Sequence, residues 1–110
     1  MRDALVSDRA TTRAHVAALE AQWAALVAAS EDSNADDEHD PEGATIGFER
    51  AQLQAVLDAA RRRLADLDEA LARHATGGYG TCETCGGPIG AERLDALPAT
   101  RRCIGCASGP

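Results

Sequence analysis

The sequence predicts an all-α protein: a long antiparallel two-helix coiled-coil hairpin followed by a small four-cysteine segment. Three observations support this prediction. Two long stretches repeat apolar residues at helical spacing, an acidic stretch separates them, and the chain's 4 cysteines all follow the second of them. We place the hairpin in residues 1–76 and the four-cysteine segment in residues 77–110.

The composition limits the size and kind of core. A chain of 110 residues is long enough for one domain. It contains 1 Trp, 1 Phe and 1 Tyr, and much of its hydrophobic content is alanine, so long helices are favoured over a large globular core. The net charge of −7 disfavours contact with a nucleic-acid backbone. We therefore expect no direct, sequence-specific DNA binding, and we expect basic protein surfaces as partners.

The N-terminal residues contain no continuous apolar run of the kind that forms a signal peptide. No segment is apolar enough to span a bilayer. We therefore expect no membrane association and a cytoplasmic location, where reducing conditions make structural disulfides rare.

The first helix is predicted from residue 4 to about residue 31. Its apolar positions recur at steps of about three and four, with one gap at Arg9. They are Leu5, Thr12, Val16, Leu19, Trp23 and Leu26. Glycine and proline are absent until Pro41, so nothing interrupts a long helix before the acidic stretch.

The second helix is predicted from Pro41 to about Ala75. Asp40 suits the N-cap, and Pro41 suits the first helical position because its missing N–H is not needed there. Gly77-Gly78 is the expected C-terminal stop. The apolar positions form two seven-residue repeats, namely Ile46, Leu53, Ala60 and Leu67, and Leu57, Leu64 and Leu71.

The two apolar seams match when residues whose numbers add up to 76 are paired antiparallel. This pairing sets Trp23 against Leu53 and places Arg50 opposite Leu26, with its aliphatic stem over that leucine. The turn then falls at Glu38, within the acidic stretch. A homodimer or bundle formed through the same seam is the alternative to the intramolecular hairpin, which we expect to be a monomer.

The four cysteines form two C-x2-C pairs, Cys82 with Cys85 and Cys103 with Cys106. This spacing is typical of a tetrahedral four-thiolate Zn²⁺ site, so we predict a small four-cysteine zinc finger with these residues as ligands. A thioredoxin-like redox pair needs a βαβ context that is not predicted here, and iron is an alternative metal. Four thiolates leave no open metal position, and the chain has no nucleophile–base constellation, so we expect no enzyme activity.

The segment from Tyr79 to Cys106, YGTCETCGGPIGAERLDALPATRRCIGC, resembles the zinc-finger signature of the TraR/DksA family of bacterial transcription regulators. The similarity lies in Tyr79-Gly80, both cysteine pairs, Ile89, Arg93-Leu94 and Pro98. The resemblance implies that RNA polymerase is the partner. Members insert a two-helix coiled coil into the polymerase's secondary channel, where the acidic tip alters the stability of promoter complexes.

Residues 31–42, the acidic tip, contain seven Asp and Glu residues. The resemblance implies contacts near the polymerase active centre from Asp37 and Asp40, with Asp36 and Glu42 beside them. The pair matches the first two positions of the family pattern Asp-x-x-Asp-x-Ala, while Glu42 replaces the alanine.

A solvated acidic turn is the alternative, because acidic residues stabilise a helix N-terminus by about 0.3–1 kcal/mol each. Glu31 and Asp32 favour a functional tip, since they lie near the C-terminal end of the first helix, where negative charge opposes the helix dipole.

Phe48 falls on the outward face of the second helix, so we consider it a partner contact, although single exposed apolar residues are common. The sequence therefore predicts a transcription regulator that binds RNA polymerase. The alternative is a small zinc-stabilised protein-interaction adaptor whose tip has no activity at polymerase.

Overall fold

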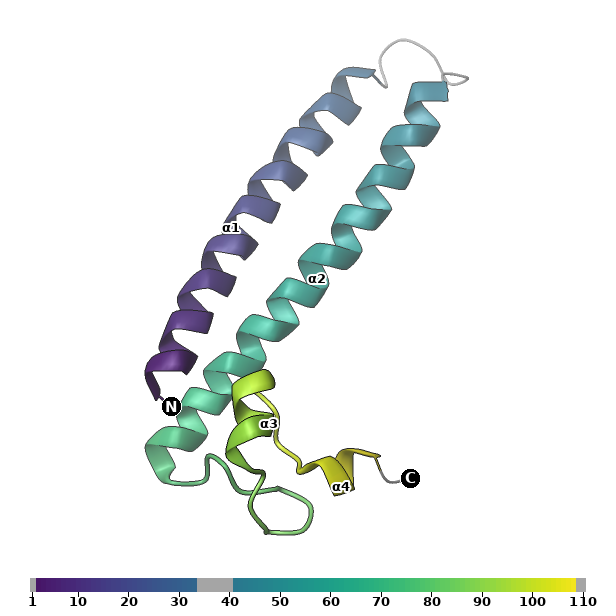
Figure 1. Cartoon of the computed structure of the whole chain (residues 1–110). Helices are drawn as coiled ribbons and strands as arrows, with labels where there is room; N and C mark the ends of the chain where they lie inside the picture. Colours follow the sequence, from purple (N-terminus) through teal and green to yellow (C-terminus); the bar gives the residue numbers. More distant parts are fainter. Residues whose placement is uncertain (1, 34–40, 109–110) are drawn as a thin grey trace. The chain divides into compact units, whose positions relative to one another are not determined.

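The computed structural model describes residues 2–33 and 41–108, and Figure 1 traces them. The elements follow in the order α1 (Arg2–Ser33), α2 (Pro41–Thr76), α3 (Ala91–Ala96) and α4 (Ile104–Ser108). Within these ranges, β pairing is limited to an isolated antiparallel bridge between Thr81 and Pro88. The predicted all-α fold, with two long helices ahead of a four-cysteine segment, is confirmed.

The ends of the long helices follow the local signals in the sequence. Helix α2 begins at Pro41 and ends at Thr76, and Gly77 follows with a positive φ of 86°. The Gly78 amide donates to the carbonyl of Arg73 at 2.8 Å, which satisfies one of the last helical carbonyls. Helix α1 extends about two residues further at each end than predicted. The predicted turn at Glu38 lies outside the described residues.

The chain divides into two compact units, and each contains a part of both long helices. One unit is Thr12–Arg62, and the other joins Met1–Thr11 to Arg63–Pro110. The expected division into residues 1–76 and 77–110 stays a prediction. None of the described helices combines the length and the apolar character needed to cross a membrane.

In the unit Thr12–Arg62, α1 and α2 lie side by side and antiparallel. Val16 and Leu19 of α1 are buried together with Leu57 and Ala60 of α2, as the heptads predict. The exposed pair Glu20 and Arg61 lies across the same two helices, with its charged groups 3.9 Å apart. Three other residues of the predicted seam, Trp23, Leu26 and Leu53, are only half buried.

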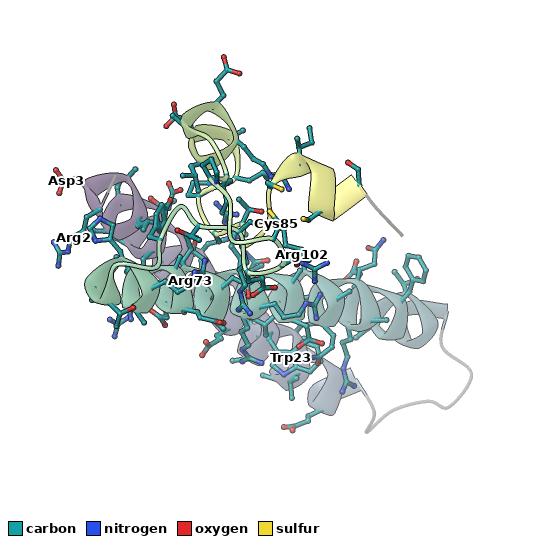
Figure 2. All side chains as sticks on the ribbon, turned by 90° about the horizontal axis from the view of Figure 1, so that it is seen from below. Arg2, Asp3, Trp23, Arg73, Cys85 and Arg102 are labelled. Atoms are coloured by element: carbon teal, nitrogen blue, oxygen red, sulfur yellow. The ribbon has the colours of Figure 1, made fainter. Side chains whose placement is uncertain are left out.

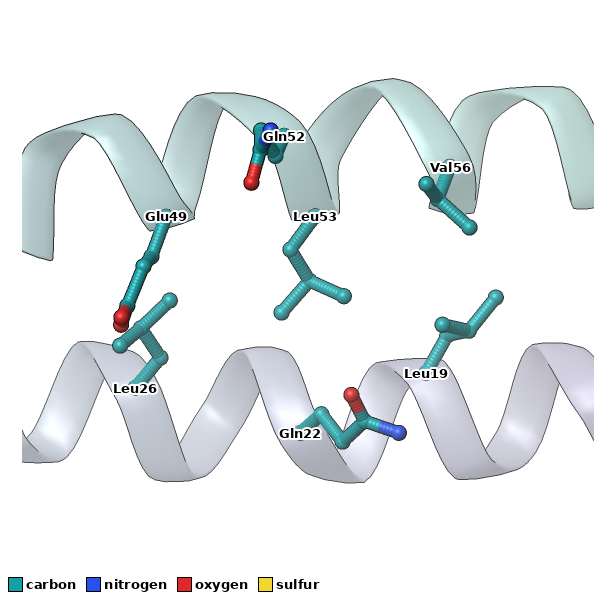
Figure 3. Close-up of a pocket in the computed structure, with 7 residues that line it drawn as sticks. All are labelled: Leu19, Gln22, Leu26, Glu49, Gln52, Leu53 and Val56. Carbon is teal, nitrogen blue, oxygen red and sulfur yellow. The ribbon is translucent and has the colours of Figure 1, made fainter.

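The guanidinium of Arg50 has a partner that was not predicted. It lies over the ring of Trp23, 5.6 Å from the ring centroid. A guanidinium is attracted to the electron-rich face of an indole ring, which an aliphatic side chain does not offer. Figure 3 shows Glu49 beside Leu26 and Val56 beside Leu19.

In the other unit, the finger segment covers the helix pair. Leu5 of α1 and Leu67 and Ala70 of α2 have no exposed surface. Three partly buried residues pack against them: Leu71 of α2, and Tyr79 and Ala99 of the finger segment. Because two helices alone leave one side of their seam open, the finger residues act as a third layer and account for the complete burial of Leu5 and Leu67.

Candidate functional site

The first cysteine pair lies in a tight turn that follows the second long helix. The amide of Gly86 donates to the carbonyl of Cys82 at 2.9 Å, and Gly86 has a φ of 75°, which favours glycine. The amide of Gly87 then donates to the sulfur of Cys85 at 3.4 Å. The turn therefore directs a backbone N–H at a sulfur, as expected for a thiolate that needs hydrogen-bond donors.

The second cysteine pair lies at the start of α4. The amide of Ala107 donates to the carbonyl of Cys103 at 3.0 Å, which begins the helical turn between Cys103 and Cys106. A further backbone bond, from the Glu83 amide to the Arg101 carbonyl at 2.9 Å, joins this segment to the first cysteine turn. Residues about twenty positions apart are thereby brought together.

The four sulfurs of Cys82, Cys85, Cys103 and Cys106 lie within 4.8 Å of one another. The sulfurs of Cys85, labelled in Figure 2, and Cys103 are 3.8 Å apart. A tetrahedral ion with metal–sulfur bonds of about 2.3 Å separates its ligand sulfurs by about 3.8 Å. A disulfide would need about 2.05 Å, and all four cysteines are free. The site therefore fits a metal ion bound by four thiolates.

The protonation of the cluster also favours a cation. Hydrogen bonds from the backbone of Cys103, and next from that of Cys85, lower the pKa of Cys82 to about 6. Hydrogen bonds to the side chains of Cys103 and Cys82 raise the pKa of Cys106 to about 12. Without an ion, neighbouring sulfurs thus stabilise a proton on Cys106, because thiolates this close repel one another. A bound metal ion replaces that proton and neutralises the thiolates.

A small apolar core lies directly beside the sulfurs. Cys82, Ile89 and Leu94 form a buried cluster, and Tyr79 packs against it. The hydroxyl of Tyr79 donates to the carbonyl of Pro98 at 2.9 Å. Tyr79 also packs against the buried residues of the long helices, so one aromatic ring contacts both cores of this unit.

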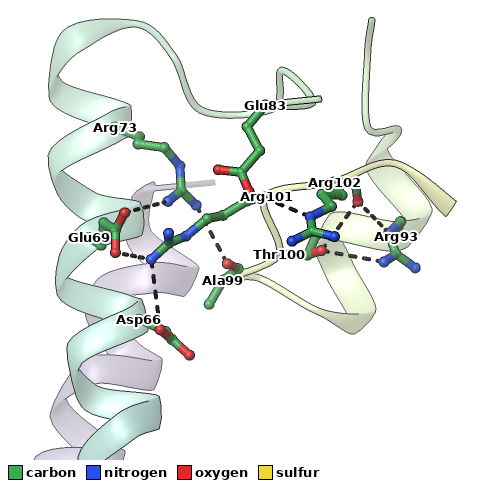
Figure 4. A network of polar contacts seen from close by, with 9 residues as sticks. All are labelled: Asp66, Glu69, Arg73, Glu83, Arg93, Ala99, Thr100, Arg101 and Arg102. Carbon is green, nitrogen blue, oxygen red and sulfur yellow. Dashed lines mark hydrogen bonds and ion pairs between the residues drawn. The ribbon is translucent and has the colours of Figure 1, made fainter. Parts of the chain in front are cut away.

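A polar network ties the finger segment to α2 (Figure 4). The Arg101 guanidinium is ion-paired with Glu69 and lies 3.9 Å from the carboxylate of Asp66. The Arg73 guanidinium donates to the Ala99 carbonyl at 3.5 Å. Sequence reasoning missed this network. Its signal was the spacing of Asp66 and Glu69, which places both acids on one face of α2.

Inside the finger segment, a second arginine fixes the approach to the last cysteine pair. The Nε of Arg93 in α3 donates to the Arg102 carbonyl at 2.8 Å. The Arg102 side chain in turn lies 3.5 Å from the carboxylate of Glu83, the residue that directly follows Cys82 (Figure 4). These contacts hold the segment before Cys103 against the first cysteine turn.

The structure does not describe the side chains of the predicted tip residues. Asp36, Asp37 and Asp40 lie outside the described residues, and the side chain of Glu42 is also outside the described part of the structure. Phe48 is described: it lies on α2 with 67% of its surface exposed. The role of the tip and the contact role of Phe48 stay predictions.

Residues 77–109 match the sequence model of the prokaryotic DksA/TraR C4-type zinc finger. General stress protein 16O of Bacillus subtilis is 35% identical over 72 residues, which cover 66% of this chain and 44% of that protein. The RNA polymerase-binding transcription factor DksA of Caulobacter vibrioides is 42% identical over 56 residues, 51% of this chain and 39% of that protein. The matched regions thus span less than half of these relatives.

The fold has a solved counterpart. The structure of transcription factor DksA2 from Pseudomonas aeruginosa matches with a TM-score of 0.81 and 27% identity, over 97% of this chain and 77% of that one. The match therefore includes the long helices as well as the finger segment. The cysteine segment, the curated relatives and the fold agree, and together they support the TraR/DksA family for this chain.

Proposed function

We propose that this protein is a transcription regulator that binds RNA polymerase. The observation that supports this most strongly is the fold match to a transcription factor over 97% of the chain. The Caulobacter relative, which is named for binding RNA polymerase, adds sequence similarity over 51% of the chain. The net charge of −7 agrees with a protein partner rather than with DNA as the direct target.

The mechanism that we propose is insertion of the acidic tip, residues 31–42, into the secondary channel of the polymerase. Asp36, Asp37, Asp40 and Glu42 would act there electrostatically and alter the stability of promoter complexes. The bounds of the helices support this proposal, since α1 ends at Ser33 and α2 begins at Pro41. Asp36, Asp37 and Asp40 thus belong to the sequence that connects the two long helices, and Glu42 belongs to the first turn of α2.

The metal in this proposal is Zn²⁺, held by Cys82, Cys85, Cys103 and Cys106. Zinc would supply the cross-link that a segment with so small an apolar core needs in order to stay folded. The chain's own residues orient the sulfurs through the backbone bonds described above. Four thiolates complete a tetrahedral shell, so we propose a structural site and a protein without enzyme activity.

The remaining parts of the proposal concern partners and location. We propose that the protein acts as a monomer in the cytoplasm and that Phe48 contributes an apolar contact to its partner. The exposure of the Phe48 ring supports the second point, since exposed aromatic residues are favoured anchors at interfaces.

A binding assay combined with transcription in vitro tests the proposal. The immobilised chain should retain bacterial RNA polymerase, and the double variant Asp37→Asn/Asp40→Asn should still bind but lose its effect on transcription. The control Glu92→Gln/Asp95→Asn removes the same two charges from α3 and should regulate normally. Failure to retain polymerase would instead favour an interaction adaptor, and normal regulation by the tip variant would refute the tip mechanism.

A further inference from the structure

The two cysteine pairs of the finger segment are anchored in different ways. Cys82 of the first pair is 1% exposed and lies in the buried cluster with Ile89 and Leu94. The turn around this pair is closed by a backbone bond from the Cys82 amide to the Gly87 carbonyl at 2.8 Å. The first pair is therefore fixed by apolar packing and by its own backbone bonds.

Neither cysteine of the second pair is buried as deeply as Cys82. Cys103 and Cys106 are partly buried and pack against the same cluster. Helix α4, described over its full length, has no buried residue, and Ile104 is 69% exposed. Because burial contributes less here, the position of the second pair depends more on polar contacts of the residues that lead into it.

Arg93 of α3 makes two such contacts. Its Nε donates to the Arg102 carbonyl at 2.8 Å, one residue before Cys103 (Figure 4). A second nitrogen of the same guanidinium lies 3.4 Å from the Thr100 hydroxyl oxygen. That hydroxyl in turn donates to the Arg102 carbonyl at 3.3 Å. The three groups form a closed ring of hydrogen bonds, and hydrogen bonds from a charged donor are stronger than those between neutral groups.

The guanidinium can hold this segment because its own helix is fixed. Leu94, the next residue of α3, is 6% exposed and lies in the buried cluster beside Cys82. The Leu94 amide also donates to the Gly90 carbonyl at 3.1 Å, at the start of the helix. Helix α3 thus joins the core beside the first cysteine pair to the backbone that precedes the second pair.

We propose that Arg93 is a positioning residue for the metal site. By holding the Arg102 carbonyl, it keeps Cys103 and Cys106 where they complete the four-thiolate shell with the first pair. The inference rests on the proposed zinc site and concerns how firmly the site retains its ion. Ligands that are held in place lose less conformational entropy when they bind an ion, so removal of the Arg93 bonds should speed the loss of the ion.

The test measures how fast the full zinc-loaded chain loses its metal to an excess of chelator. Arg93→Gln removes the bonds to the Arg102 carbonyl and should raise the release rate about tenfold. Arg102→Gln is the matched control, since it removes the same charge but keeps the carbonyl that Arg93 bonds. The contact that it breaks, with Glu83, is exposed, so the release rate should change by less than about twofold.

A second readout separates positioning from a general loss of stability. Alkylation of the zinc-loaded chain, mapped by mass spectrometry, gives one labelling rate for each cysteine pair. In Arg93→Gln, the rate for the second pair should rise about threefold more than the rate for the first pair, whereas uniform destabilisation raises both alike. Thr100→Val removes only the hydroxyl and should shift the ratio in the same direction by a smaller factor. It decides the question if Arg93→Gln does not fold.

Equal release rates for Arg93→Gln and the parent would overturn the proposal, and so would an equal rise of both labelling rates. An effect of Arg102→Gln as large as that of Arg93→Gln would also overturn it, because charge rather than the hydrogen bonds would then retain the ion. A parent chain that holds no zinc would refute the metal site itself, so the two failures are distinguishable.

Discussion

Arg101, two residues before Cys103, is ion-paired with Glu69, which lies about two turns before the C-terminal end of α2. The same guanidinium lies 3.9 Å from the carboxylate of Asp66, one turn away. The finger segment is thus held to the long helix by charge as well as by the apolar contacts of Tyr79 and Ala99. This connection is the part of the unit that the cysteine spacing alone does not indicate.

Replacing Arg101 by Gln should reduce the stability of this connection without removing the metal. Because both partners are partly exposed, with side-chain exposures of 34% and 49%, the loss should be at most about 1 kcal/mol. In a thermal melt of a domain this size, that corresponds to a decrease of about 4–8 °C or less. Arg62→Gln, at an exposed position of α2, is the control and should melt like the parent. A lost metal ion in the Arg101 variant would contradict this account.

Tyr79→Phe removes one hydrogen bond but keeps the ring that joins the two cores. Loss of the bond to the Pro98 carbonyl should cost about 0.5–1.5 kcal/mol of unfolding free energy. The measurement is chemical denaturation at neutral pH. An unchanged midpoint would indicate that this bond contributes nothing to the fold.

The same tyrosine predicts a pH dependence. Burial raises the pKa of Tyr79 above its ordinary value of 10.0, since desolvation disfavours the phenolate. The stabilisation is fully present below the pKa of the unfolded chain and is lost as the pH rises through the folded pKa. Above pH 10, the parent should therefore lose stability faster than Tyr79→Phe does. Parallel stability curves for the two proteins would contradict the raised pKa.

Metal removal should unfold the finger segment. A chelator should abolish the amide dispersion of residues 77–108 in NMR spectra, because the apolar cluster around Cys82 is too small to hold the segment alone. Replacing Cys106 by Ser should have a similar effect and reduce the metal content. The parent should contain one zinc ion per chain, and a chain purified without chelator that lacks metal would refute the site.

Metal affinity should fall on acidification. Binding of the ion displaces thiol protons, because cysteines in the unfolded metal-free segment have the ordinary thiol pKa of about 8.5. The affinity should therefore decrease steadily as the pH is lowered from about 8 to about 5. An affinity that does not change over this range would contradict binding by thiolates.

Much of the architecture was predictable because its signals are local. Pro41 and Gly77 mark the ends of α2, and both cysteine pairs have the spacing of a tetrahedral site. The contact between Arg50 and Trp23 was not predictable in this way. Heptad matching treats the seam as apolar and takes no account of the attraction between a guanidinium and the Trp23 ring.

The short helices and the ion pairs of the finger were missed for another reason. Helices α3 and α4 contain 6 and 5 residues, too few to show a helical period in the sequence. The spacing of Asp66 and Glu69 places both acids on one face of α2, but it does not say that Arg101 is their partner, because that contact depends on how the folded segment returns to the helix. The predictions for Asp37 and Asp40 concern residues outside the described ranges, so they need a functional experiment.

Site-specific photo-crosslinking tests the central claim most directly. A photoreactive amino acid at position 38, in the middle of the acidic tip, should crosslink to polymerase residues that line the secondary channel near the active centre. The same group at exposed position 92 of the finger segment should crosslink elsewhere on the polymerase. If the chain binds polymerase but position 38 crosslinks only to its outer surface, the proposed insertion of the tip is wrong.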